Sequence, residues 1–409
     1  MSSEVPAAGP SVPRSARGVL DGVRVVDFTQ VLAGPYGTSL LGDFGADVIK
    51  VEPPGGEPFR AIDNLIAPGE SGYYYGINRS KRAMTLNLKD PAARAIVERL
   101  VRQSDVVVVG FRPAAVARIG LDWESLSSIN PRLVHCSLTA FGDTGPLAAE
   151  PGMDIVVQAL SGVLALTGTP DLPPVKTGPS IADFTGAFLM VTAVLAGLRV
   201  RDRDGIGQQV SVNLLDGQIA MLANFITPYF LTREPIRRAG GGHPQVVPYQ
   251  LFEASDGFMV VACLNDTFWA PLCRGIDHAE LIDDPRYATN PVRAANRGEL
   301  IPFLEGLFAT ATRDVWLSRL RSHGVPCAPV NELEDALSQP QVVHNKALTE
   351  LKHPVYGSYT VPSNPIKMSE SPPRPHGYVP GVGEHTSEVL AELGFDQGQI
   401  SAFQASGVV

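Results

Sequence analysis

Between residues 20 and 141, short β-rich runs alternate with segments that carry helix signals. Runs rich in valine and isoleucine predict strands, whereas apolar residues spaced three or four apart predict amphipathic helices. The predicted strands are residues 23–28, 47–52, 83–89, 105–111 and 132–141, and the predicted helices include residues 92–104 and 123–130. Strands separated by helices need crossover connections, which place the strands parallel and the helices on both faces of the sheet. We therefore predict an α/β fold with a Rossmann-like parallel sheet.

A parallel sheet of this kind often binds a dinucleotide, but the glycine motifs for that are missing. The nearest match, Gly205-Ile206-Gly207, lacks a third glycine at the right spacing. It also precedes the predicted strand 208–215, whereas the dinucleotide motif follows a strand and opens a helix. No GxxxxGK[ST] motif is present either. The sequence therefore argues against both nucleotide-binding motifs.

Beyond residue 213 the pattern predicts a second, smaller region. Residues 214–231 predict a long helix, and a glycine-rich turn follows at residues 237–244. Two strands joined at Ser255-Asp256-Gly257 predict a β-hairpin. Further predicted elements are helices around 266–275 and 298–323, an extended proline-rich connection at 361–381, and a final amphipathic helix ending at Gly394. This region is predicted to be a smaller α/β or α+β domain.

Composition and charge narrow the classes of partner. The net charge of −9 argues against nucleic-acid binding, which needs a clustered basic face. The N-terminus has no signal-peptide pattern, and the longest apolar run, residues 188–198, is shorter than the ~18–20 residues that span a bilayer. The four cysteines are Cys136, Cys263, Cys273 and Cys327, with no CxxC pair. We expect reduced core thiols in a cytoplasmic protein with no metal, membrane or nucleic-acid partner, and a cysteine nucleophile is the lesser alternative.

Asp183 stands at the start of an apolar helix and has two interpretations. The helix is predicted from apolar residues at helical spacing, beginning at Phe184 and continuing to Leu198. Aspartate is a favoured N-cap residue, typically contributing ~1 kcal/mol. A carboxylate in this position could also serve as a nucleophile. Taken alone, this stretch favours the cap.

Several motifs together resemble the class III CoA-transferase family, which includes formyl-CoA transferases and the α-methylacyl-CoA racemases. The matching segments are residues 20–56, 110–121, 152–162, 181–186, 205–217, 243–257, 324–331 and 383–394. The resemblance implies a homodimer of two subunits threaded through each other as interlocked rings. It also implies four segments along the chain. Residues 1–18 form a flexible N-terminus, residues 19–230 the large Rossmann-like domain and residues 231–340 the small domain. Residues 341–409 form a return segment, whose C-terminal helix packs on the large domain.

The same resemblance implies that Asp183 is the nucleophile of a CoA-transferase. In the transferases of the family, the matching aspartate attacks an acyl-CoA and gives an aspartyl-acyl anhydride and CoA thiolate. The thiolate then forms an aspartyl-CoA thioester, which passes CoA to a second carboxylic acid. An aspartate is already anionic at neutral pH, so this chemistry needs no separate base. CoA or acyl-CoA enters as a substrate, and no permanently bound cofactor is expected.

The resemblance also implies which residues bind CoA. The matching positions are Leu32, Ala33, Leu86, Asn87, Leu88, Lys89, Gly110, Phe111, Arg112, Arg118 and Asp154. Lys89 and Arg118 suit the phosphates of CoA, although both could be ordinary surface charges. Gly110 stands where the family commonly has Asn, and Pro53 where some members have a basic residue, so Arg112 is a candidate replacement cation. Asp154 could instead have a structural role at a helix start.

Gly240, Gly241 and Gly242 match a loop that covers the nucleophile in some transferases. Glycine lets backbone N–H groups approach a ligand closely and lets a loop move. A flexible linker between a helix and a strand is the alternative.

Two other functions remain as alternatives. The racemases use a histidine in a Gly-His-Asp motif as one of two bases, but here the motif reads Gly152-Met153-Asp154. Methionine cannot exchange a proton, which disfavours racemisation. A non-catalytic CoA-binding subunit of a hetero-oligomer is the other alternative, and Asp183 argues against it. No local motif identifies the acyl-CoA donor or the acid acceptor.

Overall fold

The computed structural model describes residues 18–409, so all but the last residue of the expected N-terminal segment 1–18 lies outside the described residues. The described residues form two compact units. The first contains residues 18–161, 178–227 and 343–409, and the second contains residues 162–177 and 228–342. Residues 162–177 thus group with the second unit, although they lie inside the range 19–230 expected for the large domain.

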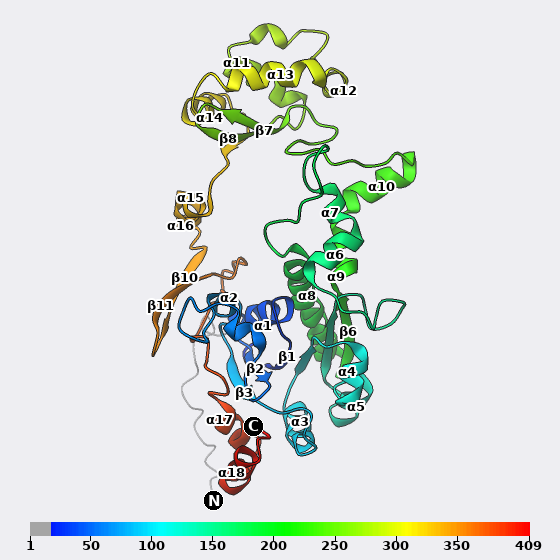
Figure 1. Ribbon diagram of the computed structural model, residues 1–409, viewed down its shortest axis with the longest axis vertical. Helices are drawn as coiled ribbons and strands as arrows, with labels where there is room; N and C mark the ends of the chain where they lie inside the picture. The colour runs from blue at the N-terminus through cyan, green and yellow to red at the C-terminus, as the bar shows by residue number, and fades with distance from the viewer. Residues whose placement is uncertain (1–17) are drawn as a thin grey trace, which may run out of the picture. The chain divides into compact units, whose positions relative to one another are not determined.

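A six-stranded parallel sheet forms the centre of the first unit, with the strand order β3-β2-β1-β4-β5-β6 (Figure 1). The strands are β1 (Arg24–Phe28), β2 (Asp47–Glu52), β3 (Arg82–Thr85), β4 (Val106–Val109), β5 (Val134–Thr139) and β6 (Gln208–Asn213). In register, Val26 of β1 lies between Ile49 of β2 and Val107 of β4. The predicted Rossmann-like parallel sheet is confirmed. Four predicted strands are too long at their carboxyl ends, because residues 86–89, 110–111, 140–141 and 214–215 lie beyond the last residue of their strand.

Helices cover both faces of this sheet, as the alternation of side chains along the strands requires. Val25 faces a core that includes Leu41 of α1 and Met190 of α8. The next residue, Val26, faces a second core with Leu100 of α3 and Leu390 of α17. The helices of this unit are α1 (Ala33–Asp43), α2 (Gly72–Ile77), α3 (Ala93–Arg102), α4 (Pro113–Arg118), α5 (Trp123–Ile129), α6 (Asp154–Ser161), α8 (Ile181–Asp204), α9 (Leu214–Met221), α17 (Thr386–Glu392) and α18 (Gln397–Ala405).

Helix α8 is the one helix within residues 18–409 that is long and apolar enough to cross a bilayer by length and composition. It extends the predicted apolar run in both directions. Its buried side includes Met190 and Val194, which pack in the same core as Val134 and Leu138 of β5. Gly197 permits close contact with the sheet, since a Cβ there would lie 2.8 Å from Val134 Cγ1.

Local contacts explain how α1 and α3 begin, and one predicted helix is wrong. Residues 33–37 begin α1, and Pro35 in its first turn forfeits no intrahelical hydrogen bond. The N-cap of α3 is Ala92, whose backbone N–H donates to the carboxylate of Asp90. The long helix predicted over residues 214–231 consists of two helices, α9 and α10 (Ala223–Thr232), separated at Leu222.

The second unit has an antiparallel three-stranded sheet in the order β7-β8-β9. The predicted hairpin is confirmed, with Ser255 and Asp256 forming its two-residue turn. The core of this unit contains the aromatic side chains of Phe252, Trp269, Phe308 and Trp316. The principal elements of this unit are α7 (Val163–Leu166), β7 (Tyr249–Ala254), β8 (Gly257–Ala262), α11 (Trp269–Gly275), α12 (Asn290–Ala295), α13 (Arg297–Phe308), α14 (Arg313–Ser322), β9 (Cys327–Pro329) and α15 (Leu333–Ser338).

The C-terminal part of the chain, after α16 (Pro340–His344), contributes a hairpin and two helices to the first unit. The hairpin, β10 (Leu348–His353) with β11 (Gly357–Pro362), was not predicted. Helix α17 ends as expected before Gly394, whose φ is +81°. A further helix, α18, follows and was also missed. Its signal was present, because Asp396 and Gln399 form a capping box.

Candidate active site

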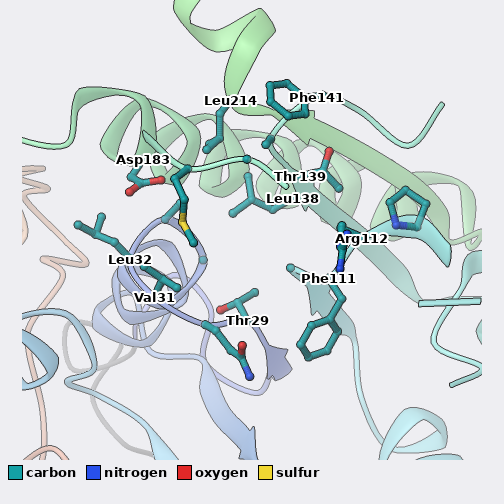
Figure 2. Close-up of a pocket in the computed structure, with 18 of the residues that line it drawn as sticks. Thr29, Val31, Leu32, Phe111, Arg112, Leu138, Thr139, Phe141, Asp183 and Leu214 are labelled. Atoms are coloured by element: carbon teal, nitrogen blue, oxygen red, sulfur yellow. The ribbon is translucent and has the colours of Figure 1, made fainter. Parts of the chain in front are cut away.

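A pocket opens at the carboxyl edge of the parallel sheet, where β1 lies between β2 and β4 and the chain order reverses. Ligands of open α/β sheets bind at such a point. The pocket is lined chiefly by the segments that follow three strands: 29–34 after β1, 110–113 after β4 and 138–141 at the end of β5. The rest of the wall contains Asp183 and Leu214 (Figure 2), together with Ala148, Glu150, Gly152 and Met153. The cavity has a volume of about 210 Å³.

Asp183 lies in the wall of this pocket, in the first turn of α8. The expectation that Asp183 is the N-cap is wrong, because Ser180 occupies that position and Asp183 is the third helical residue. A carboxylate in a first turn is stabilised by the partial positive charge at the helix N-terminus. The position combines this stabilisation with access to the pocket.

Asp154 connects α6 to the start of α8. It is the first residue of α6, and its Oδ1 accepts the N–H of Ala182 at 2.8 Å. Its Oδ2 accepts the side-chain amide of Gln158 at 2.7 Å. Ala182 is the neighbour of Asp183, so Asp154 anchors the backbone next to the pocket carboxylate. This contact supports the structural alternative for Asp154 and also places it beside the site.

The sequence did not single out Tyr73, which does not line the pocket but feels the charges of the carboxylates around it. Burial raises the pKa of its phenol to about 12, and the negative charges of Asp183 and Asp154 add to the effect. Its hydroxyl is protonated at neutral pH, as any phenol of ordinary pKa is, and can donate a hydrogen bond. Tyr73 belongs to a run of three tyrosines of which Tyr74 and Tyr75 are buried. Its partial exposure beside two buried tyrosines is a property of the folded chain, so no signal in the sequence singled it out.

Gly110, Phe111 and Arg112 lie together on the β4 side of the pocket (Figure 2). A Cβ on Gly110 would be 3.4 Å from Thr29, which is ordinary van der Waals contact. The guanidinium of Arg112 donates to the carbonyl of Ala149 at 3.2 Å, and the side chain is exposed. Arg112 therefore puts a positive charge in the pocket wall. Leu32 and Ala33 form the opposite wall, at the start of α1.

Lys89 and Arg118 lie together in a second depression, which also contains Leu88 and Arg94. Helix α4 connects the two hollows, since Pro113 lines the first and Arg118 the second. At 1.5 Å per residue, the helix spans about 8 Å between them.

Two of the other predicted CoA contacts have structural roles. The Leu86 side chain is 1% exposed and packs in the core with Phe28. The side-chain oxygen of Asn87 accepts the backbone N–H of Lys89, and the backbone N–H of Asn87 donates to the carbonyl of Val408. These two residues shape the turn that carries Leu88 and Lys89.

The glycine segment 240–242 belongs to the second unit, where backbone hydrogen bonds hold it. The N–H of Gly240 donates to Gly168, and the carbonyl of Gly241 accepts the N–H of Leu251 in β7. The φ of Gly240 is +62°, which favours glycine. The segment is thus tied at both ends, unlike a plain flexible linker.

The cysteines and potential metal ligands give no competing site in the part of the chain that the structure describes. Burial raises the pKa of the Cys136 and Cys273 thiols to about 12 and that of Cys263 to about 11. Such thiols are poor nucleophiles at neutral pH. Across residues 18–409, no group of three His, Cys, Asp or Glu side chains could hold a metal ion.

Comparison with known proteins shows the family of this chain. The family model described as CoA-transferase family III matches residues 20–386. Succinyl-CoA:glutarate CoA-transferase of Mus musculus is 38% identical, covering 95% of this chain and 90% of the mouse protein. Succinate–glutarate CoA-transferase of Agrobacterium fabrum is 39% identical, covering 91% and 95%. A crystal structure of a CAIB/BAIF family protein from Brucella suis has a TM-score of 0.83 at 35% identity, covering 92% of this chain and all of that one.

The match extends over nearly the whole chain, and the fold and the pocket at the carboxyl edge of the sheet are consistent with it. The protein is therefore an enzyme that belongs to CoA-transferase family III.

Proposed function

We propose that the protein transfers CoA from a dicarboxylic acyl-CoA to a free dicarboxylic acid, with Asp183 as the covalent nucleophile. The observation that carries the mechanism is the position of Asp183, in the pocket wall and in the first turn of α8. The dicarboxylic substrate class is supported by the mouse and Agrobacterium relatives, whose names specify succinyl-CoA or succinate together with glutarate.

The proposed reaction begins with attack of the Asp183 carboxylate on the acyl-CoA carbonyl. The C–S bond breaks, which leaves an aspartyl-acyl anhydride and CoA thiolate. The thiolate attacks the aspartyl carbonyl, releases the donor acid and forms an aspartyl-CoA thioester. The acceptor carboxylate repeats the two steps in reverse order, so Asp183 is regenerated and acceptor-CoA leaves. Every step exchanges one activated acyl group for another, and no ATP is consumed.

Helix termini and one hydroxyl group can stabilise the negative charges in these steps. Helices α1 and α8 both begin in the pocket wall, with partial positive charge at their N-termini. The Tyr73 phenol feels the charge of Asp183 and is protonated at neutral pH, so its hydroxyl can donate to an oxyanion near that carboxylate.

CoA would extend from Asp183 toward the second depression. Lys89 and Arg118 can pair with its phosphates there, and Arg112 can do so at the pocket. The span of about 8 Å along α4 is within reach of one extended CoA molecule. Leu32, Ala33 and Phe111 supply apolar and backbone contacts along the wall.

A homodimer is part of the proposal, and an exposed apolar face supports it. Helices α6, α8 and α9 contact one another. Large apolar side chains on them are at least 38% exposed: Ile155, Val156, Leu160, Phe188, Leu189, Ile219 and Met221. Faces of this kind mark association surfaces. Light scattering on the purified chain should give a dimer mass; a monomer at micromolar concentration would contradict this part.

The four unpaired cysteines are consistent with a reducing compartment such as the cytoplasm.

The decisive experiment is the Asp183→Asn variant with a matched control. Asp216→Asn changes an exposed aspartate in the first turn of α9 and should leave turnover unchanged. Asp183→Asn should lose turnover by several orders of magnitude while the fold survives, because an amide is a poor nucleophile. Acid quenching of the wild type with succinyl-CoA, digestion and mass spectrometry should find CoA on the Asp183 peptide. Full activity of Asp183→Asn, with deamidation excluded, would refute the mechanism.

The same protein distinguishes the alternatives. Met153 in the pocket wall has no proton to exchange, so a 2-methylacyl-CoA in deuterated water should keep its α-proton when no acceptor acid is present. Rapid exchange would favour a racemase. CoA-transfer activity of the purified chain alone would exclude the alternative that it is a non-catalytic subunit.

A further inference from the structure

The turn that follows β1 has an unfavourable backbone conformation at the pocket. Val31 has a φ of +70°, in the left-handed region that β-branched residues avoid. Its neighbours Leu32 and Ala33 enter α1 and line the pocket. Such a conformation persists only where surrounding contacts enforce it.

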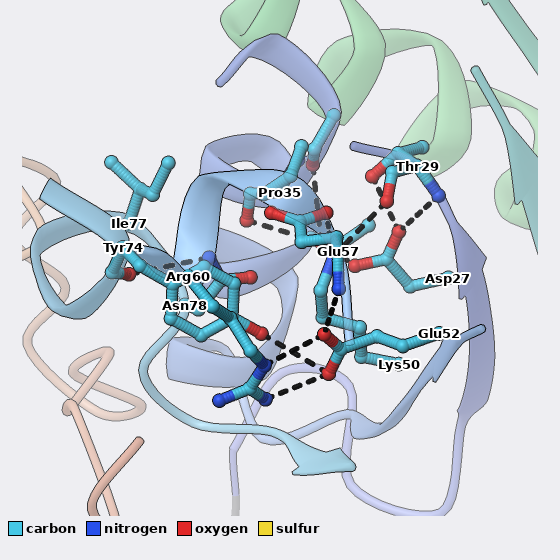
Figure 3. A network of polar contacts seen from close by, with 12 residues as sticks. Asp27, Thr29, Pro35, Lys50, Glu52, Glu57, Arg60, Tyr74, Ile77 and Asn78 are labelled. Carbon is cyan, nitrogen blue, oxygen red and sulfur yellow. Dashed lines mark hydrogen bonds and ion pairs between the residues drawn. The ribbon is translucent and has the colours of Figure 1, made fainter. Parts of the chain in front are cut away.

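Those contacts come from a buried charged cluster behind the turn (Figure 3). Asp27 Oδ1 accepts both the backbone N–H and the hydroxyl of Thr29. The carbonyl of Thr29 accepts a hydrogen bond from Lys50 Nζ at 3.0 Å. All three polar groups of Thr29 are therefore held, two residues before Val31. Asp27 is 0% exposed and Lys50 is 1% exposed, so no water competes for these bonds.

The second oxygen of Asp27 connects the turn to α1. Asp27 Oδ2 accepts from the hydroxyl of Thr38 at 2.6 Å and from Lys81 Nζ at 3.0 Å. Lys81 also donates to the carbonyl of Pro35, in the first turn of α1. One carboxylate thus fixes both ends of the segment that includes Val31.

We propose that Asp27 is a positioning residue for CoA transfer, which holds the Thr29–Ala33 segment in the strained shape that binds CoA. The inference rests on the proposed function. Asp27 does not line the pocket and acts only through Thr29, Thr38 and Lys81.

An amide cannot replace this carboxylate. Donors approach both oxygens of Asp27, and the side chain of an asparagine would present its own N–H groups to one of those sides. Asp27→Asn should therefore break either the hydrogen bonds to Thr29 or those to Thr38 and Lys81. Thr29→Val is a milder variant that removes one hydroxyl contact and keeps the shape.

The matched control is Asp43→Asn. Asp43 is also buried, lies at the far end of α1 and pairs with Arg79 and Ser80, away from the turn. Both Asp→Asn variants should lower the melting temperature. Isothermal titration with CoA should show a Kd raised about tenfold in Asp27→Asn, because the pocket wall loses its preorganisation. The Kd of Asp43→Asn should stay within about twofold of the wild type, since sites without shared partners act independently.

A double variant tests the link to strain. Glycine adopts a positive φ without a steric penalty. In the Val31→Gly variant the turn therefore depends less on the Asp27 contacts to keep its conformation. The effect of Asp27→Asn on the Kd should fall from about tenfold to about threefold in the Val31→Gly background, as coupled residues show in a double-mutant cycle.

The outcomes separate the two proposals. Wild-type protein that does not bind CoA would overturn the proposed function and this inference with it. Wild-type binding together with unchanged Kd values in Asp27→Asn and Thr29→Val would overturn this inference alone. Equal losses of CoA affinity in Asp27→Asn and Asp43→Asn would also overturn this inference. Asp27 would then contribute only to the overall stability of the fold. If Asp27→Asn does not fold, an unchanged Kd in Thr29→Val is itself sufficient to reject the inference.

Discussion

Gly34 offers a sharp test of how tightly the pocket wall is built. It lies in the first turn of α1, and a Cβ there would be 2.2 Å from the Cβ of Thr29. Van der Waals contact needs roughly 3.5–4.0 Å between carbon atoms, so one of the two segments must move by more than 1 Å. Thr29 cannot swing aside, because Asp27 and Lys50 hold its polar groups. We therefore predict that Gly34→Ala displaces the turn.

The magnitude follows from two opposed effects. Overpacking a tight site costs typically ~1–3 kcal/mol. Alanine in a helix gains ~0.5–1 kcal/mol over glycine. The midpoints of these two ranges leave a net destabilisation of about 1 kcal/mol, or a fall in Tm of roughly 2–4 °C for a domain of this size. Gly34 lines the pocket, so CoA affinity should fall as well.

The assay compares Gly34→Ala with Gly76→Ala by thermal denaturation and by CoA titration. Gly76 lies in α2 of the same unit, and a Cβ added to it would meet no neighbouring atom within 4 Å. Gly76→Ala should keep or raise the Tm and leave the Kd for CoA unchanged. A Gly34→Ala protein that matches Gly76→Ala in both measurements would refute the reasoning, because it would mean that the Thr29 turn yields freely.

Three other sets of substitutions test contacts at the two hollows and behind the pocket. Lys89→Ala and Arg118→Ala should each weaken CoA binding and reduce its salt dependence, since a charge-assisted contact contributes ~1.5–3 kcal/mol; unchanged titrations at low and high salt would make both ordinary surface charges. Asp154→Ala should lower turnover and stability together, because the N–H of Ala182 loses its acceptor at the start of α8; kinetics and melting on one preparation would contradict this if either stayed at the wild-type value. Burial alone would raise the pKa of Asp27, but the neighbouring cations and hydroxyls outweigh it and hold that pKa below its usual range. The stabilising contribution of Asp27 is therefore present above pH ~4 and is lost as the pH falls further; the acid limb of a stability–pH profile should flatten in Asp27→Asn, and an unaltered limb would exclude Asp27 as its source.

The sequence by itself determined the architecture of the large unit. Buried runs such as Val106–Val109 alternate with amphipathic segments, and only a parallel sheet covered on both faces buries them all. It also determined that Asp183 stands at a helix start and that Ser255-Asp256-Gly257 turns a hairpin. These features are local, because spacing along the chain is enough to encode them.

Only the tertiary structure decided which distant residues meet at the pocket. Asp154 bonds the start of α8 across 28 positions of sequence, and Lys81 reaches Asp27 across 54. Neither contact has a periodic or motif signal, and the strained Val31 has none either. Helix starts, turns and strands are encoded by neighbours in the chain, whereas a pocket is formed where the fold brings separate segments together. The proposed nucleophile could therefore be predicted from the sequence, whereas the residues that hold the pocket in place became visible only in the folded chain.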